Sequence, residues 1–293
     1  MSYMSLKEIE ADCLEKKITF AEAVLLDDVN ERGVDKETSL KMMAVMWNAM
    51  KEADQNYDAS LRSHSQLVGG AGAVMKSYVE EGRAICGKFM GNIIASALAM
   101  GESNACMKRI VAAPTAGACG VLPAVLVNYQ KEHGSSDEEI IESLYVAAGI
   151  GQVIAGRACI AGASGGCQAE IGSASAMAAG ALVSLGGGTP SQITHAAAMA
   201  LKNLLGLVCD PVGGLVEVPC VKRNVIGAVN AVSAADMSLA GIQSRISPDQ
   251  VIDAMREVGD QMHPTLKETG QGGLANTPDA HAMFDHQNGE AGA

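Results

Sequence analysis

The longest stretch of this sequence without Asp, Glu, Lys or Arg runs from Ile171 to Leu201, and it limits what the chain can fold into. Glycines at 186–188 and Pro190 interrupt it, so it predicts buried helices joined by a turn and not a membrane span. Aromatic residues make up 3% of the chain, against 33 Gly and 16 Met. A core of small and aliphatic side chains suits closely packed helices better than sheets, which favour aromatic residues.

Helix-start signals recur along the whole chain. Ser5, Thr19 and Ser136 each precede a Glu by three residues, which is the capping-box pattern, and Thr189 and Ser247 each precede a Pro suited to a first helical turn. Strand alternation is almost absent. We therefore predict a mainly α fold, a helical catalytic domain with cysteine-bearing loops between Ala/Gly-rich helices. Helices are expected over about 36–57, 91–109, 168–185 and 221–239.

The distribution of charge predicts the organisation of the chain. Residues 1–60 are rich in charge and are expected to form an N-terminal helical segment. The charge-poor residues 61–278 are expected to form the catalytic domain. The polar residues 279–293 are expected to be a flexible C-terminal tail.

Net charge and cysteine usage restrict the partners and the compartment. The chain carries 21 basic and 33 acidic residues, a net charge of −12, which argues against nucleic acid and anionic membranes as partners. The first residues contain no apolar signal region, so we expect a cytoplasmic protein. In that compartment eight cysteines are better explained as buried thiols or metal ligands than as disulfides.

Three cysteines lie in loops of unusual composition. Cys167 and Cys220 each stand just before an apolar helical stretch, where unpaired N–H groups favour a metal-binding thiolate. Cys209 and Cys220 bound a segment with two Pro and a Gly pair, which cannot be one helix and can bring its ends together. Alternatively, all three are small buried hydrophobes, since neither interval between them is a standard zinc or ferredoxin signature. The residues alone leave both interpretations open.

Five segments of this sequence carry a resemblance to a known family. In order and spacing they are similar to the motifs of the iron–sulfur L-serine dehydratases, and the likeness extends from about residue 5 to 278. The chain resembles the α chain of the two-chain members, because it lacks the N-terminal β region of the single-chain forms. The segments are APTAGACG at 113–120, GCQAEIG at 166–172, LVCDP at 207–211, VPCVKRN at 218–224 and ETGQGGLA at 268–275.

The resemblance implies a cofactor, a reaction and a partner. In this family Cys167, Cys209 and Cys220 are expected to hold a 4Fe–4S cluster at three irons, with the fourth iron open to substrate. The expected reaction removes water and then ammonia from L-serine and yields pyruvate. It is a step of amino-acid degradation whose product can enter gluconeogenesis. The resemblance also implies a separate β subunit and an oligomeric enzyme.

Further site residues are assigned from their positions beside these motifs. Lys222, expected to be catalytic, and Arg223, expected to bind substrate, follow a cysteine directly, although both could belong to a solvated first turn. Thr115 and Gly117 could donate hydrogen bonds to the substrate or could form only a tight turn before a helix. His64 is the best-placed histidine for a general base, with a Ser-Ser-His motif of the β chain as a competing source.

Two other functions remain compatible with the sequence. A pyridoxal-phosphate serine/threonine dehydratase would perform the same net reaction, but on an α/β fold. A zinc-stabilised, non-catalytic helical subunit would use the same thiols without chemistry. The sparse strand signals and the absence of a convincing Schiff-base lysine context argue against the first of these functions.

Overall fold

The computed structural model describes residues 3–289, and its fold is mainly α, as the sequence predicts. In this part of the chain the one β-type pairing is an isolated parallel bridge between Cys209 and Lys267. The longer helices are α1 (Leu6–Lys16), α2 (Phe20–Arg32), α3 (Lys36–Gln55), α4 (Ala71–Glu80), α5 (Gly87–Ala105), α6 (Val121–His133), α7 (Asp137–Arg157), α9 (Ser173–Leu185), α10 (Pro190–Lys202), α11 (Cys220–Leu239), α12 (Pro248–Gln261) and α13 (Pro278–Gly289). Short turns are α8 (Gly162–Gly165), η1 (Ala116–Ala118), η2 (Gln168–Gly172), η3 (Val212–Gly214), η4 (Pro264–Leu266) and η5 (Gly273–Asn276).

The expected capping residues start these helices. The side chains of Ser5 and Thr19 accept hydrogen bonds from backbone N–H groups of the first turn. Ser136 and Thr189 form complete capping boxes, which satisfy N–H groups that have no partner within the helix. Ser247 is an N-cap by backbone conformation, but its side chain makes no capping hydrogen bond.

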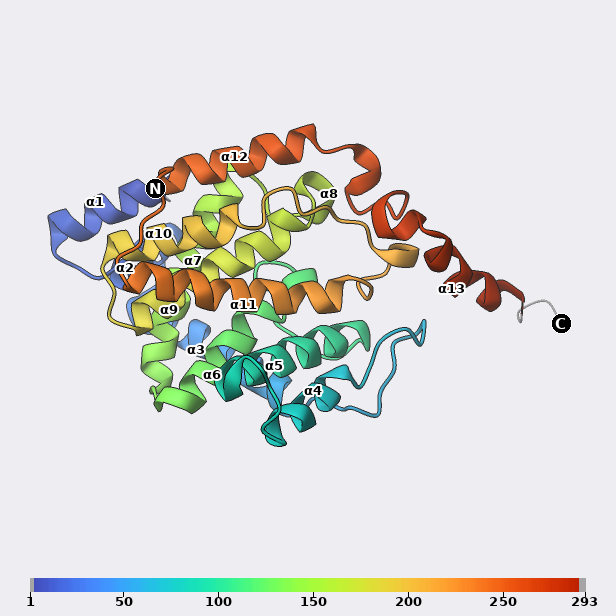
Figure 1. The fold of residues 1–293 in the computed structure, drawn as a ribbon. Coiled ribbons are helices and arrows are strands. Elements are labelled where there is room, and N and C mark those ends of the chain that lie inside the picture. Colours follow the sequence, from blue (N-terminus) through green and yellow to red (C-terminus); the bar gives the residue numbers. More distant parts are fainter. Residues whose placement is uncertain (1–2, 290–293) are drawn as a thin grey trace.

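Helix α9 is the centre of the core. All of its residues from Ser173 to Val183 are buried, and it packs against α6, α7, α10 and α11 (Figure 1). Its small side chains allow the surrounding helices to approach it closely. The turn η2, which follows Cys167, packs directly against this buried helix. So does α11, which begins at Cys220.

The N-terminal helices pack against the same core. Val24 of α2 and Trp47 of α3 belong to the hydrophobic cluster that contains α7 and α9. At the start of α7, Asp137 accepts a hydrogen bond from the Trp47 indole at 2.8 Å and forms an ion pair with Lys51 at 2.7 Å. The division of the chain into residues 1–60 and 61–278 stays a prediction.

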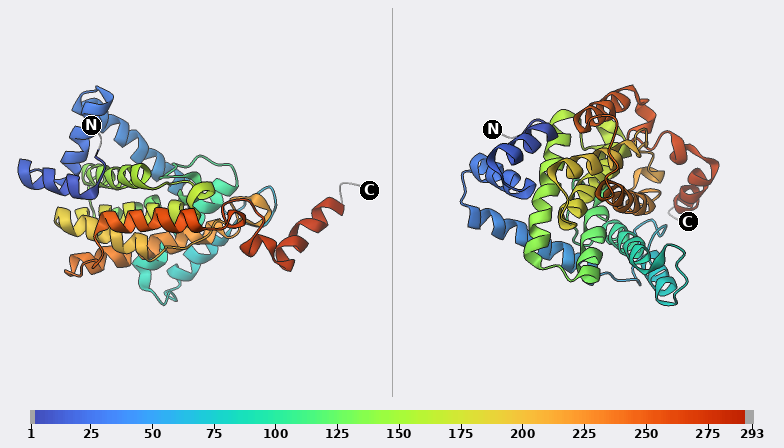
Figure 2. Two further views of the ribbon diagram at one scale, coloured as in Figure 1. Left: turned by 90° about the horizontal axis from the view of Figure 1, so that it is seen from above. Right: turned by 60° about the vertical axis from the view of Figure 1, so that its left-hand side comes forward.

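Helix α13 projects away from the body of the molecule (Figures 1 and 2). The Phe284 side chain of this helix lies against Gly213, within the loop that joins α10 to α11. Most of the expected tail is thus helical where it is described, and residues 290–293 lie outside the described residues. The expected flexibility of the tail stays a prediction.

Two predicted helices differ from the structure. The helix expected over 91–109 covers Gly87–Ala105 instead, and it ends there because Met107 takes a left-handed conformation (φ 58°). The stretch expected to be one helix over 168–185 begins with the π-helical turn η2 and becomes α-helical only at Ser173. A π turn takes one more residue than an α turn and so redirects the side chains within it.

Helix α7 is long and apolar enough to cross a membrane by length and composition alone. The mean hydropathy of its 18-residue window is 1.2, and 61% of that window is buried in the fold. Since α7 packs on α9 and α2, its apolar surface is accounted for by the core.

The buried carboxylate of Glu102 connects α5 to the start of α4. It accepts hydrogen bonds from the backbone N–H groups of Ala71 and Gly72, at 2.8 and 3.1 Å, and from the Tyr57 hydroxyl at 2.6 Å. A carboxylate suits this place because a helix N-terminus has unpaired N–H groups and a partial positive charge. Gly72 crosses α5 so closely that a Cβ atom would lie 2.9 Å from the Cα of Ala99.

We expect Gly72→Ala to lower the free energy of unfolding by about 1–3 kcal/mol, because the added methyl group would push α4 away from the α5 backbone. Chemical denaturation measures this change. Gly156→Ala is the matched control: a Cβ atom at this α7 position would meet only the end of Met4, at 3.9 Å. It should raise stability by roughly 0.5–1 kcal/mol, and equal effects of both variants would contradict the close packing of α4 on α5.

Candidate metal centre

Two of the three cysteines selected from the sequence lie at helix starts, and the third lies in a loop. Cys167 immediately precedes the turn η2, Cys220 is the first residue of α11, and Cys209 lies in the loop between α10 and α11. Their exposed fractions are 3%, 8% and 3%, respectively, so none of the three thiols is a surface group. The prediction that Cys167 and Cys220 stand at helix starts is confirmed.

The buried amide of Gln168 joins the loop of Cys167 to the loop of Cys209. Its backbone N–H donates to the carbonyl of Leu207 at 2.9 Å, and its Oε1 accepts from the Gly206 N–H at 2.9 Å. Its Nε2 donates to the Met255 carbonyl of α12 at 3.0 Å. Because a buried amide is costly to leave unpaired, these bonds fix the position of the two loops relative to each other.

Cys167, Glu170 and Cys209 form a cluster of groups that can bind a metal. Their two sulfur atoms and one carboxylate oxygen all lie within 4.8 Å of one another. The redirection of side chains in the π turn η2 is consistent with this position of Glu170, only three residues after Cys167. Thiolates bind transition metals such as iron and zinc, and carboxylates bind them through oxygen.

Cys220 is not one of the three groups that lie within 4.8 Å of one another, although the charge of Cys167 affects its pKa. The three thiols differ in their acidity. The hydrogen bond from the Cys209 thiol and then the nearby Arg223 guanidinium lower the pKa of Cys167, although burial opposes them. The same hydrogen bond and burial raise the pKa of Cys209. Burial, with a smaller contribution from the charge of Cys167, raises the pKa of Cys220 to about 12. Burial thus opposes the thiolate that the helix start is expected to favour at Cys220, and that expectation stays a prediction.

Arg223 is the cation of the site. Its Nη1 donates to the Val208 carbonyl at 2.7 Å and lies 3.5 Å from the sulfur of Cys167, and its Nη2 forms an ion pair with Asp210 at 2.8 Å. Asp210 in turn accepts a hydrogen bond from the Leu274 N–H at 2.7 Å. Of the neighbouring cations Lys222 and Arg223, Arg223 is thus the one beside the Cys167 sulfur, where it can offset thiolate charge, and its assignment to substrate binding stays a prediction.

Glu170 is bordered by Thr115 and Gly117, two of the three residues expected to bind substrate. Its Oε1 accepts a hydrogen bond from the Thr115 hydroxyl at 2.7 Å, and a Cβ atom at Gly117 would lie 3.1 Å from the same oxygen. At Gly162 a Cβ atom would lie 2.7 Å from Oε2 and 3.1 Å from the sulfur of Cys209. The absence of a side chain at both glycines thus lets the backbone approach the carboxylate closely, and burial raises the pKa of Glu170.

The buried amide of Asn224 holds the start of α11, where Cys220 lies, against the loop that carries Thr115 and Gly117. Asn224 donates through Nδ2 to the carbonyls of Gly117 and Cys220, at 2.8 and 3.0 Å, and accepts from the Gly120 N–H at 2.8 Å. The start of α11 and the loop that carries Thr115 are therefore one connected unit. Cys220 cannot shift along its helix axis without leaving these groups unpaired.

A segment from near the C-terminus completes the wall behind Cys209. The Cys209 N–H donates to the Leu266 carbonyl, and the Glu268 N–H donates to the Cys209 carbonyl, both at 2.8 Å. Glu268 has a left-handed backbone (φ 61°), and its exposed carboxylate raises the pKa of both Glu170 and Cys209. Glu268 therefore lies within electrostatic reach of the cluster, in the last of the five motifs.

The two residues expected to be catalytic lie outside this network. The His64 side chain is exposed, in a loop held by the neighbouring hydroxyls of Ser63 and Ser65, both of which donate to the buried carboxylate of Glu217. Lys222 is also exposed and lines a cavity of about 120 Å³ together with Glu217. The loop of His64 and the segment that contains Glu217 therefore meet close to the start of α11. The catalytic assignments of His64 and Lys222 stay predictions.

The sequence interpretation missed Glu170 and Asp210 as site residues. A usable signal for Glu170 was its position three residues after Cys167, because residues at this spacing share one side of a helix. The remaining cysteines do not join the cluster. Cys119, for example, is buried against the Met100 carbonyl, and burial raises its pKa to about 12.

Comparison with known proteins identifies the family. A family profile described as serine dehydratase alpha chain matches residues 15–275. The chain belongs to the serine dehydratase alpha chain family. The resemblance predicted from the five motifs is thereby confirmed.

Relatives within the serine dehydratase alpha chain family match almost the whole chain. The probable L-serine dehydratase alpha chain of Bacillus subtilis is 45% identical over 94% of this chain and 92% of its own length. The L-serine dehydratase alpha chain of Peptoniphilus asaccharolyticus is 42% identical over 92% of this chain and 93% of its own length. A longer relative, the L-serine dehydratase of Streptomyces coelicolor, is 48% identical over 61% of this chain and only 40% of its own length.

We expect Arg223→Gln to raise the pKa of the Cys167 thiol, because the substitution removes a cation that favours the thiolate. The measurement is the ultraviolet absorbance of thiolate against pH in protein stripped of metal under anaerobic conditions. Lys222→Gln is the matched control, since this neighbouring cation is exposed. Unchanged titration curves in the Arg223 variant would contradict the role given to its guanidinium.

Proposed function

We propose that this chain is the catalytic alpha subunit of an iron–sulfur L-serine dehydratase, which converts L-serine to pyruvate and ammonia. In this proposal Cys167, Cys209 and Cys220 hold a 4Fe–4S cluster. The proposal combines family membership with one structural observation, namely that buried thiols from two separate loops meet beside a carboxylate.

The donor set fits an iron–sulfur cluster. Cluster irons are held by cysteine thiolates, and the three thiols here are buried among apolar and glycine-rich segments. Arg223 would offset part of the negative charge that the thiolates and sulfides bring into the interior. When bound, the cluster would supply a Lewis-acidic iron that polarises the oxygens of the substrate.

Three protein thiolates leave one position of such a cluster without a cysteine ligand. A site with four cysteine ligands would be closed to substrate, as structural metal sites are. Among the described residues, the group beside Cys167 and Cys209 is the carboxylate of Glu170, which the backbone at Gly117 and Gly162 approaches closely. We propose that L-serine binds next to this carboxylate.

In this position Glu170 would bind the ammonium group of serine. A half-buried carboxylate with a raised pKa gains from a cationic partner, because the positive charge returns its pKa toward the usual range. Thr115 would hold the carboxylate in place through its hydroxyl. The base that removes the Cα proton would come from His64 or from the β subunit.

The proposal includes a partner and a location. The names of the two alpha-chain relatives imply a separate β chain, and we propose that this protein acts together with one. We also propose an oligomeric enzyme in the cytoplasm, a compartment that suits eight free cysteines. A pyridoxal-phosphate enzyme is disfavoured, because the described residues form helices and a single isolated bridge instead of an α/β fold.

We expect Cys167→Ser, Cys209→Ser and Cys220→Ser each to abolish pyruvate formation and to lower the bound iron and sulfide after anaerobic reconstitution with the β chain. Cys13→Ser is the control, since this thiol is buried in α1. This variant should keep both its pyruvate formation and its bound iron and sulfide. Full iron content and activity in any of the three variants would remove that cysteine from the ligand set. Stoichiometric zinc without iron in the active protein would instead favour a zinc site.

We expect Glu170→Gln to lower kcat/KM for L-serine by about 10- to 100-fold, mainly through KM, because it removes a charged hydrogen-bond partner of the substrate. The iron content should stay unchanged. Glu268→Gln is the comparison. This substitution should lower kcat/KM less than about threefold, because water screens the exposed Glu268 carboxylate. A Glu170 variant that has lost its iron would show that this carboxylate supports the cluster and not the substrate.

A further inference from the structure

Helices α2, α3 and α7 border a cavity that no residue of the cysteine site touches. Its volume is about 360 Å³, which lies in the range of about 300–1,000 Å³ that small-molecule sites occupy. Most of its wall is apolar and includes three methionines, whose flexible side chains adapt to a ligand. The apolar wall consists of Val24, Met42, Met43, Val45, Met46 and Ala148, and the polar residues are Asp28, Arg32, Ser39, Tyr145 and Gln152.

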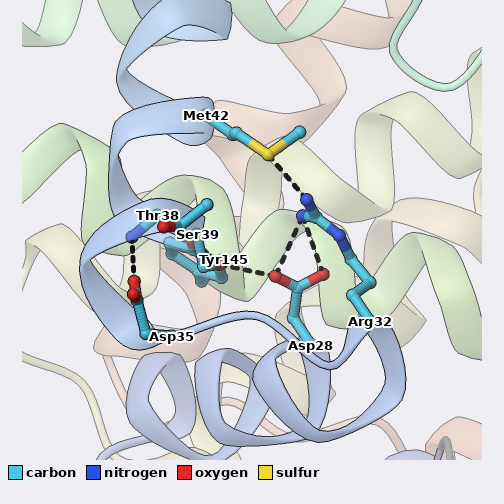
Figure 3. Close-up of polar contacts among 7 residues, drawn as sticks. All are labelled: Asp28, Arg32, Asp35, Thr38, Ser39, Met42 and Tyr145. Atoms are coloured by element: carbon cyan, nitrogen blue, oxygen red, sulfur yellow. Dashed lines mark hydrogen bonds and ion pairs between the residues drawn. The ribbon is translucent and has the colours of Figure 1, made fainter.

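A chain of hydroxyl groups fixes the polar end of the cavity (Figure 3). The Ser39 hydroxyl donates to Asp28 at 2.5 Å and lies 2.6 Å from the Tyr145 hydroxyl. Ser39 has only one proton and gives it to Asp28, so Tyr145 must be the donor to Ser39. The Ser39 and Tyr145 side chains are buried, with 1% and 3% exposed, so water does not exchange freely into this chain.

Arg32 has donors that its neighbours satisfy only poorly. Its Nη1 donates to the two oxygens of Asp28, at 3.2 and 3.4 Å. Its Nη2 faces the sulfur of Met42 at 2.6 Å, and Figure 3 shows this thioether on the side away from Asp28. A thioether is a weak acceptor, so among the described residues Asp28 is the one strong acceptor given for this guanidinium, whose side chain is 36% exposed and thus accessible to a ligand. Asp28, by contrast, already accepts from both Ser39 and Arg32.

We propose that this cavity binds a small monocarboxylate with a branched apolar body. The carboxylate would take the place of the Met42 sulfur at Nη2 of Arg32, because a charged acceptor is stronger than a thioether. The apolar body would lie against Met43, Met46 and Ala148. Since Asp28 already accepts from Ser39 and Arg32, an ammonium group on the ligand has no matching partner and is not required for binding. The carboxylate is the shared requirement, and it is present in an amino acid and in its deaminated acid.

The test uses the full chain with methionine methyl groups labelled with ¹³C, and it follows their resonances by NMR. The probes are 4-methylpentanoate, L-leucine and 3-methylbutylamine, which carry the same branched body with a carboxylate, with both charges, or with an ammonium group alone. We expect both carboxylates to shift the resonances of Met42, Met43 and Met46 in a saturable manner. The amine should leave them unchanged.

Two variants test the polar end of the cavity. Arg32→Gln should weaken 4-methylpentanoate binding about tenfold or more, because it removes the cation. Arg83→Gln is the matched control, since Arg83 forms a similar ion pair with Glu81, at 2.9 Å, outside the cavity. Gln152→Glu should also weaken binding, because it adds a charge of the same sign as the ligand to the cavity wall.

Three outcomes would overturn the proposal. One is the absence of any shift with either carboxylate, and another is an equal shift with the amine. The third is an Arg32 variant that is folded and binds as tightly as the unchanged chain. Methionine shifts that follow protein concentration instead of ligand concentration would point to a second copy of the chain on this surface, and would also overturn it.

Discussion

Hydrogen bonds of two buried amide side chains hold the cysteine-bearing loops together. Gln168 connects the start of η2 to residues 206–207 and to α12, and Asn224 connects the start of α11 to the loop that carries Thr115. Helix packing alone leaves loops free to shift, whereas a buried amide with every group paired admits one arrangement. The position of the thiols is therefore set by polar groups within an apolar interior.

The electrostatics of the site differ from those of the chain as a whole. A chain with net charge −12 repels anions at long range, yet the half-buried Arg223 provides a local positive charge beside Cys167. Its partner Asp210 is 2% exposed, and such a buried ion pair adds little net stability. Its effect is geometric, since it connects the Cys209 loop, the start of α11 and the segment that contains Leu274.

Helix starts were the most predictable part of this structure, because capping depends on a few adjacent residues, as at Ser136 and Thr189. The position of Cys167 and Cys220 at helix starts followed instead from the apolar helical stretches that come after them. The π turn at η2 was not predictable, because one additional residue per turn leaves almost no trace in an Ala/Gly-rich pattern. Long-range pairing, as between Cys209 and Lys267, and burial, which raises the pKa of Cys220, depend on the completed fold.

The pairing of Cys209 with residues 266–268 has a consequence for the order in which the site matures. A ribosome makes all three thiol-bearing residues before it makes the segment that closes the wall behind Cys209. A nascent chain therefore holds these sulfurs without their final enclosure until that segment has been made. A chain cut by a protease ahead of residue 264 would likewise retain every thiol of the site and lose the backbone pairing of Cys209.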